Sequence, residues 1–284
     1  MSSGVDHLLH NAELLLHEEE HTDAIAFLNS IDSDRPFNSA KKQLLLGMAY
    51  AANNEIDHAR IAWQGIYQEW SASIYALGQL YLGDLEAGQG NLAAAEQLWK
   101  SIELAWDTAC YAQAQLNRGE LEIQRNDREM ASSYWLGIEK DWDVGCFAKA
   151  QLYLGEMAEH QRDDVLSKRY WLSIEESWDA ESYAWAQLYL ADLAMREGDE
   201  PCAERHWRNV DSEMSLWCYG QALYNLGKLE KSRANRDKAA QYWKSIKEEF
   251  GTYYPWAQLQ LGLLAYDAED FDLARHYWMN IQKT

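Results

Sequence analysis

One five-residue string in the chain, HEEEH at residues 17–21, has the spacing of a zinc-hydrolase helix. That chemistry needs two His one helical turn apart as zinc ligands, a Glu as the base and a third ligand. Here Thr22-Asp23 follows directly and reads as the cap of another helix, so the motif would end in a turn. No third ligand follows in a recognisable motif, and an acidic stretch produces this pattern easily by chance. We therefore predict no catalytic residue, no metal and no cofactor.

A second group of residues has the chemistry of binding rather than of reaction. Four carboxylates lie 36 residues apart in the middle of the chain, and a Tyr or an Asn precedes each of them by three residues. Side chains three or four residues apart share one face of a helix. Carboxylates pair with Lys or Arg, and aromatic rings stack on guanidinium groups or apolar side chains. The predicted partner-binding residues are Tyr81, Asp84, Asn117, Glu120, Tyr153, Glu156, Trp185, Tyr189 and Asp192.

These columns belong to a repeat whose marker is a Trp followed three residues later by Ile or Val. Neighbouring markers are 36 residues apart five times and 35 residues apart once. A fixed period of this size is the signature of a solenoid, in which each unit buries its apolar face against its neighbours. The marker residues are Trp63, Trp99, Trp135, Trp171, Trp207, Trp243 and Trp278.

Each unit contains two helical patterns separated by a turn of Gly, Asn, Asp and other polar residues. Apolar or small residues recur at three- and four-residue steps in residues 112–124, which predicts a helix with one buried stripe. Three such helices are preceded by an Asp in the place of an N-cap, namely Asp107, Asp143 and Asp179. The second helix carries a small residue four positions before the Trp, which allows close approach of its partner helix while the indole fills the space beside it.

The repeat resembles the tetratricopeptide repeat. Gly83 is followed by Ala twelve residues later and by Trp99 sixteen residues later, which fits the tetratricopeptide hairpin. The fullest form of the leading helix, AKAQLYLG at residues 148–155, also has a Gln that is more similar to the related Sel1-like repeat. We expect this Gln column to hydrogen-bond to a neighbouring helix end. The resemblance implies an all-α, right-handed solenoid whose leading helices line a concave groove that holds the ligand. The family's clamp for a C-terminal carboxylate is matched only in part, by Asn117, Asn225 and Lys149, so that activity is not carried over.

The resemblance covers almost the whole chain as about eight helix-turn-helix repeats in a single repeat domain, residues 1–284. A degenerate first unit is expected at about residues 5–39, with a leading helix over about residues 5–19. The later units are expected to start near residues 40, 76, 112, 148, 184, 220 and 255. No separate solubilising helix follows Ile281, so homo-oligomerisation through uncapped ends is an open alternative.

The composition limits the kinds of partner. With 25 Lys and Arg against 46 Asp and Glu, the chain has a net charge of −21, which argues against nucleic acid or an anionic membrane as the ligand and allows a basic protein or peptide. No window is apolar enough for a membrane span, and the N-terminus does not read as a signal peptide. Cys110, Cys146 and Cys218 occupy equivalent places in their repeats, and such places on neighbouring repeats should lie about 10 Å apart, which is too far for disulfides. Free thiols favour a cytoplasmic location, or a periplasmic one if a signal peptide was removed.

These observations predict a non-enzymatic scaffold that binds a basic or amphipathic protein segment in its groove. The resemblance adds that bacterial proteins with such arrays often serve as assembly factors, chaperones or regulators. Three alternatives remain open. The carboxylates are a solvated helix surface in a chain that is acidic throughout, or the chain masks a basic enzyme as an inhibitor or immunity protein, or it is a self-associating structural solenoid.

Overall fold

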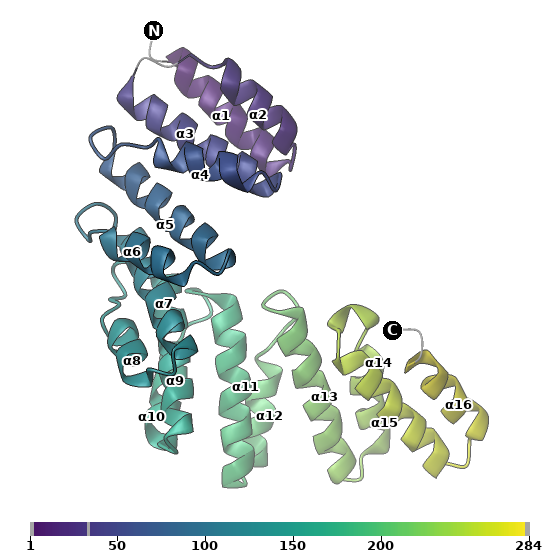
Figure 1. Cartoon of the computed structure of the whole chain (residues 1–284). Coiled ribbons are helices and arrows are strands. Elements are labelled where there is room, and N and C mark those ends of the chain that lie inside the picture. The colour runs from purple at the N-terminus through teal and green to yellow at the C-terminus, as the bar shows by residue number, and fades with distance from the viewer. Residues whose placement is uncertain (1–2, 33–34, 282–284) are drawn as a thin grey trace. The chain divides into compact units, whose positions relative to one another are not determined.

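The computed structural model describes residues 3–32 and 35–281, and within these ranges the regular elements are sixteen α-helices and one short 3₁₀-helix (Figure 1). The predicted all-α class is therefore confirmed. The helices form eight successive hairpins, as the repeat predicted. The chain divides after Phe147 into two compact units, each of which we describe by itself. The single repeat domain over residues 1–284 stays a prediction.

Unit 1 contains the first four hairpins. They pair α1 (Ser3–His17) with α2 (His21–Ser30), α3 (Pro36–Ala52) with α4 (Ile56–Gln64), α5 (Ala72–Gly88) with α6 (Leu92–Ser101), and α7 (Thr108–Gln124) with α8 (Arg128–Leu136). Unit 2 contains the last four, although its first helix begins just before the division. They pair α9 (Val144–His160) with α10 (Asp164–Leu172), α11 (Ala180–Glu197) with α12 (Glu200–Arg208), α13 (Leu216–Ser232) with α14 (Arg236–Ser245), and α15 (Tyr253–Asp267) with α16 (Phe271–Asn280). The 3₁₀-helix η1 (Glu248–Phe250) precedes α15.

The leading helices start where side-chain caps are available. Asp107 Oδ1 accepts a hydrogen bond from the backbone N–H of Cys110 at 2.9 Å, and Asp179 Oδ1 accepts one from Ser182 at 2.7 Å. Asp143 does the same for Cys146, so the three predicted N-caps are confirmed. The helices begin two to four residues before the predicted unit starts, because the cap and the first turn precede the first residue of the buried stripe.

The turn inside each hairpin contains one residue in the left-handed region of backbone space, followed directly by the N-cap of the second helix. Gly takes this place in two hairpins, as Gly90 and Gly198. In the other six hairpins a residue with a side chain takes the left-handed conformation, with φ between 60° and 62°. These residues are Glu19, Asn54, Asn126, Arg162, Ala234 and Glu269.

The first hairpin shows why the HEEEH string is no zinc helix. The first helix ends at His17, Glu19 takes the left-handed conformation, and Glu20 is the N-cap of α2, which starts at His21. The two His therefore lie on different helices, as the predicted turn required. The position of the cap was predicted wrongly, because Thr22-Asp23 lie in the first turn of α2 rather than at its cap. Among the described residues, no group of three or more His, Cys, Asp or Glu is placed to hold a metal ion.

The core of six of the eight hairpins contains a Trp packed against a Gly. A Cβ added to Gly47, Gly119 or Gly155 would lie 2.1–2.2 Å from the indole Nε1 of the Trp sixteen residues later. The same holds at Gly83, Gly227 and Gly262, at 2.1–2.3 Å. Glycine is required here because the helix backbone and the indole share this space.

Most of these indoles donate a hydrogen bond to the backbone carbonyl nineteen residues earlier. Trp63, Trp135, Trp171, Trp243 and Trp278 do so at 3.2–3.4 Å. The sixth hairpin breaks the rule: Ala191 stands in place of the Gly, and the buried Nε1 of Trp207 has no hydrogen-bond acceptor. In the other six hairpins with a core Trp the indole lies against a Gly that has no such methyl group.

The four cysteines are free, as predicted. Burial raises the pKa of the Cys110 thiol to about 12 and that of Cys218 to about 11, so both thiols are protonated at neutral pH. No helix among the described residues has the length and apolar character needed to cross a membrane.

Candidate binding faces on the leading helices

The structure places the nine predicted partner-binding residues on four leading helices. Tyr81 and Asp84 lie on α5, and Asn117 and Glu120 lie on α7, all in unit 1. The other five lie in unit 2, with Tyr153 and Glu156 on α9 and Trp185, Tyr189 and Asp192 on α11. The predicted row of four carboxylates is thus shared between two units, and one continuous groove along it stays a prediction. We describe a face for each unit.

The face of unit 1 contains a hollow of about 240 Å³ next to Asp84, which we name the Asp84 hollow. Asp84 Oδ1 accepts a hydrogen bond from the indole Nε1 of Trp99 at 3.1 Å and one from the Nδ2 of Asn117 at 2.6 Å. Asn117 is held in turn by Gln113, whose Nε2 donates to Asn117 Oδ1 at 2.8 Å. Glu120 also lines the hollow. Asp84 is therefore fixed by its own chain rather than free in solvent.

This arrangement changes the acidity of Asp84. The protein packed around the carboxyl group raises the pKa of Asp84 from 3.8 to about 6, although one side of the residue is exposed. The charge of Glu120 acts in the same direction, whereas the hydrogen bonds from Trp99 and Asn117 favour the carboxylate and limit the rise. A raised pKa in a concave site marks a candidate for function.

The face of unit 2 contains a different hydrogen-bonded carboxyl group, that of Glu156. Tyr189 donates its hydroxyl proton to Glu156 Oε1 at 2.8 Å, and its ring stacks on the core indole of Trp171 with centroids 5.0 Å apart. Burial raises the pKa of Glu156 and also that of Tyr189. Asp192 differs from both, because it is exposed and makes no hydrogen bond or ion pair with any described residue. Partial burial, followed by the charge of Glu159, raises the pKa of Asp192.

A run of aromatic rings extends from Tyr189 across three leading helices, and we name it the aromatic ladder. Trp185 on α11 lies 5.9 Å from Tyr189 and stacks on Trp217 of α13, with centroids 4.7 Å apart and planes 26° apart. Trp217 then meets Tyr253 of α15 edge-on at 5.1 Å, and Tyr253 meets Trp256 at 5.7 Å. Trp217 is 39% exposed and Trp256 is 52% exposed.

Comparison with known proteins identifies the architecture. No family model matches the chain, and no curated protein matches it. Solved structures do match it, among them the following three. One is the C-terminal part of a TPR repeat-containing protein from Cytophaga hutchinsonii, with 14% identity, a TM-score of 0.55, and 84% of this chain and 93% of that chain covered. A tetratricopeptide repeat protein from Parabacteroides merdae has 16% identity and a TM-score of 0.52, covering 95% of this chain and 98% of that chain.

The third is the pilF protein of Pseudomonas aeruginosa, with 17% identity, a TM-score of 0.56, and 76% of this chain and 94% of that chain covered. The chain has the tetratricopeptide-type fold. At sequence identities this low, a structural match shows a shared fold and not a shared function. They confirm the tetratricopeptide resemblance, while its Sel1-like variant stays a prediction.

In this tetratricopeptide-type fold the Gln column bonds to the second helix, as expected, in three hairpins. Gln151, Gln187 and Gln258 accept hydrogen bonds from Ser173, Asn209 and Asn280, each two residues after the core Trp. Gln115 instead pairs with Tyr111 and Arg118, and Gln79 has no partner among the described residues.

Three ladder residues, Trp217, Tyr253 and Trp256, were not predicted as site residues. Trp256 stands in the same column as Trp185, but Trp217 lies 32 residues after Trp185, which is one helical turn short of the repeat. A search for columns of fixed period does not find it. A search for aromatic residues one turn to either side of a column would have found it, because rings on adjacent helices meet at such offsets.

Proposed function

We propose that the chain is a binding scaffold that receives a basic or amphipathic segment of another protein on the faces of its leading helices. The observation that carries this proposal is the aromatic ladder. Exposed indoles are a frequent centre of binding energy in protein interfaces. The ladder rings also hold one another in place, so little side-chain freedom is left to lose when a partner binds.

The charge of the chain favours a basic partner over an acidic one. The net charge is −21. On the same helical face as Trp185 and Tyr189, Asp192 offers a carboxylate without a hydrogen bond or ion pair among the described residues, although Arg196 and Lys228 act on its charge. An Arg of the partner can pair with such a carboxylate while its guanidinium stacks on an indole. Apolar side chains of an amphipathic segment fit the remaining rings.

We propose no reaction for either face. A carboxyl group with a pKa of about 6 in a hollow is also what a general acid needs, so Asp84 deserves comparison with a catalytic group. Of the described residues that line the Asp84 hollow, none is Ser, Cys, His or Lys. The hydrogen-bond partners of Asp84 are the side chains of Trp99 and Asn117, neither of which exchanges a proton at ordinary pH.

A peptide-display selection on the full chain tests the proposal, followed by affinity measurements on three proteins. These are the wild type, the ladder variant Trp217→Ala/Trp256→Ala, and the control variant Val165→Ala/Leu172→Ala on α10, whose residues are 83% and 57% exposed. We expect segments rich in Arg or Lys that bind the ladder variant at least about tenfold more weakly and the control equally well. Acidic segments, or equal binding to all three proteins, would contradict the proposal. Binding that collapses with salt and survives loss of the rings would instead indicate the acidic masking function.

A further inference from the structure

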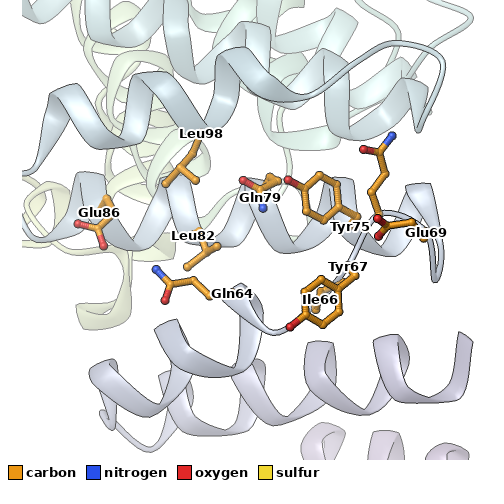
Figure 2. A pocket seen from close by; sticks show the side chains of 10 residues that line it. Gln64, Ile66, Tyr67, Glu69, Tyr75, Gln79, Leu82, Glu86 and Leu98 are labelled. Atoms are coloured by element: carbon orange, nitrogen blue, oxygen red, sulfur yellow. The ribbon is translucent and has the colours of Figure 1, made fainter. Parts of the chain in front are cut away.

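A second hollow lies on another face of α5, in unit 1. It has a volume of about 420 Å³ and opens between α4, α5 and α6 (Figure 2). Its α5 residues include Tyr75, Gln79 and Leu82. Each of them stands two residues before one of Leu77, Tyr81 and Asp84, which share one face of α5. Two residues turn a helix by about 200°, so this hollow and the Asp84 hollow occupy opposite faces of α5. We name it the Gln79 hollow.

The next repeat shows why this place is empty. Thirty-six residues on, Arg118 stands in place of Leu82 and Tyr134 in place of Leu98. Arg118 lies over the ring of Tyr134 at 4.2 Å and donates to its hydroxyl oxygen at 2.8 Å. The same guanidinium donates to the Oε1 of Gln115, the counterpart of Gln79, at 3.0 Å. The chain therefore fills this position with a guanidinium group in one repeat and leaves it open in the repeat before.

The hollow contains hydrogen-bond acceptors that no described residue binds. Neither Gln79 nor Glu69, which both line the hollow, has a hydrogen bond or ion pair with any described residue. Glu86 is already occupied, because it accepts from Arg60 Nε at 2.7 Å and from Asn91 Nδ2 at 2.7 Å. Of the described residues that line the hollow, none is Lys or Arg.

We propose that the Gln79 hollow binds an arginine side chain of another protein. The guanidinium takes the place that Arg118 occupies one repeat later, donating to Gln79 Oε1 beside the ring of Tyr75, with Glu69 balancing its charge at the mouth. The alkyl stem lies against Leu82 and Leu98. Lysine fits less well, since its ammonium group has neither the planar fork nor the stacking face of a guanidinium. The site lies in a different unit from the ladder and does not depend on the function proposed above.

Titration of the ¹⁵N- and ¹³C-labelled full chain with N-acetyl-arginine amide, followed by NMR, tests this assignment. We expect saturable shifts of the Gln79 side-chain amide and the Leu98 methyl signals. N-acetyl-citrulline amide, which is neutral, and N-acetyl-lysine amide should bind at least about fivefold more weakly, because each lacks one element of the charged planar fork. An absence of shifts with the arginine probe, or equal response to the lysine probe, overturns the proposal.

Variants of the hollow test whether the arginine probe binds there. Leu82→Arg places the chain's own guanidinium where Arg118 lies one repeat later and should abolish the shifts, while Gln97→Arg adds the same group at an exposed neighbouring position and should leave them unchanged. Glu69→Gln should weaken binding by about 2- to 5-fold, as loss of an exposed charge pair does. If Leu82→Arg does not fold, Gln79→Leu takes its place, with the same loss expected in the Leu98 methyl signals. Wild-type binding by the folded hollow variant would refute the site.

Discussion

The two candidate faces use the same columns of the same repeat for different chemistry. In unit 1 the column six residues before the repeated Gly holds Lys41, Leu77 and Gln113, and the nearby acid Asp84 is hydrogen-bonded and has a raised pKa. In unit 2 that column holds Lys149, Trp185, Gln221 and Trp256, and the rings of its two Trp residues belong to the ladder. The hairpin framework fixes where side chains are presented, and two or three positions per repeat decide what they present.

The difference has a consequence for binding. Binding of a partner at the Asp84 hollow would depend on ionisation and on salt, because the exposed carboxylates of Asp84 and Glu120 supply the attraction. A partner held on the aromatic ladder would depend on ring surface and little on salt. The same segment can be tested against both faces, because the residues that differ are known.

The largest expected effect concerns the framework beneath both faces. Trp171→Ala should lower the free energy of unfolding by about 3–5 kcal/mol, since the indole is fully buried and bonds to the Leu152 carbonyl. Trp207→Ala should cost about 1 kcal/mol less, because the indole of Trp207 has no hydrogen bond to lose. Urea unfolding followed by circular dichroism measures both. Equal losses would show that the indole bond adds nothing to stability in these hairpins.

The next effect separates the two faces. Trp217→Ala should weaken a segment selected on the ladder by at least about tenfold, equally at low and high salt. Asp84→Asn should leave the affinity of that segment unchanged, because Asp84 lies in the other unit's face. Isothermal titration calorimetry at two salt concentrations gives both comparisons. A larger loss from Asp84→Asn than from Trp217→Ala would reverse the assignment of the main face.

The helical hairpins could be predicted from the sequence because the residues that mark them repeat at a fixed period. The Trp marker, the small residue one turn before it and the caps at Asp107 and Asp179 each occur at a fixed period, and each proved to have the predicted role. The cap of α2 was misplaced, because Glu20 offers no side-chain cap bond and only the left-handed residue before it marks the turn.

The sites were less accessible to sequence reasoning because they arise where the period fails. Trp99 bonds to Asp84 rather than to the carbonyl nineteen residues earlier, and that choice depends on side-chain geometry. Trp217 stands one turn out of its column, and the Gln79 hollow lies where Leu82 and Leu98 stand in place of the Arg118 and Tyr134 of the next repeat. An exception to a column is visible in the sequence, but whether it leaves a hollow or is filled by a neighbour is a matter of packing.

The pH dependence of Asp84 provides a smaller and specific test of the unit 1 face. Its pKa is raised in the folded protein, so protonation favours folding, and this contribution is lost as the pH rises from about 4 through about 6. Wild type should therefore lose stability relative to Asp84→Asn between pH 4 and pH 7. Binding of a cation in the hollow should strengthen over the same interval. Carbon-detected NMR titration of the carboxyl group measures the pKa directly, and a value near 4 would remove the distinction between this acid and an ordinary surface Asp.

The smallest expected effect is a change in stability at turns that belong to neither face. It also serves as the control for the binding comparison. Arg162 lies in the left-handed region with φ 61° and is exposed without a side-chain partner among the described residues, so Arg162→Gly should stabilise the chain by about 0.5–1 kcal/mol. Gly198→Ala, at the equivalent turn two helices later with φ 78°, should destabilise it by about 1 kcal/mol. Thermal unfolding measures both shifts, and opposite signs are required if backbone strain is their cause. If segment binding to the ladder is unchanged in both variants while stability moves in opposite directions, a loss of affinity in Trp217→Ala reports the missing ring rather than a weakened fold.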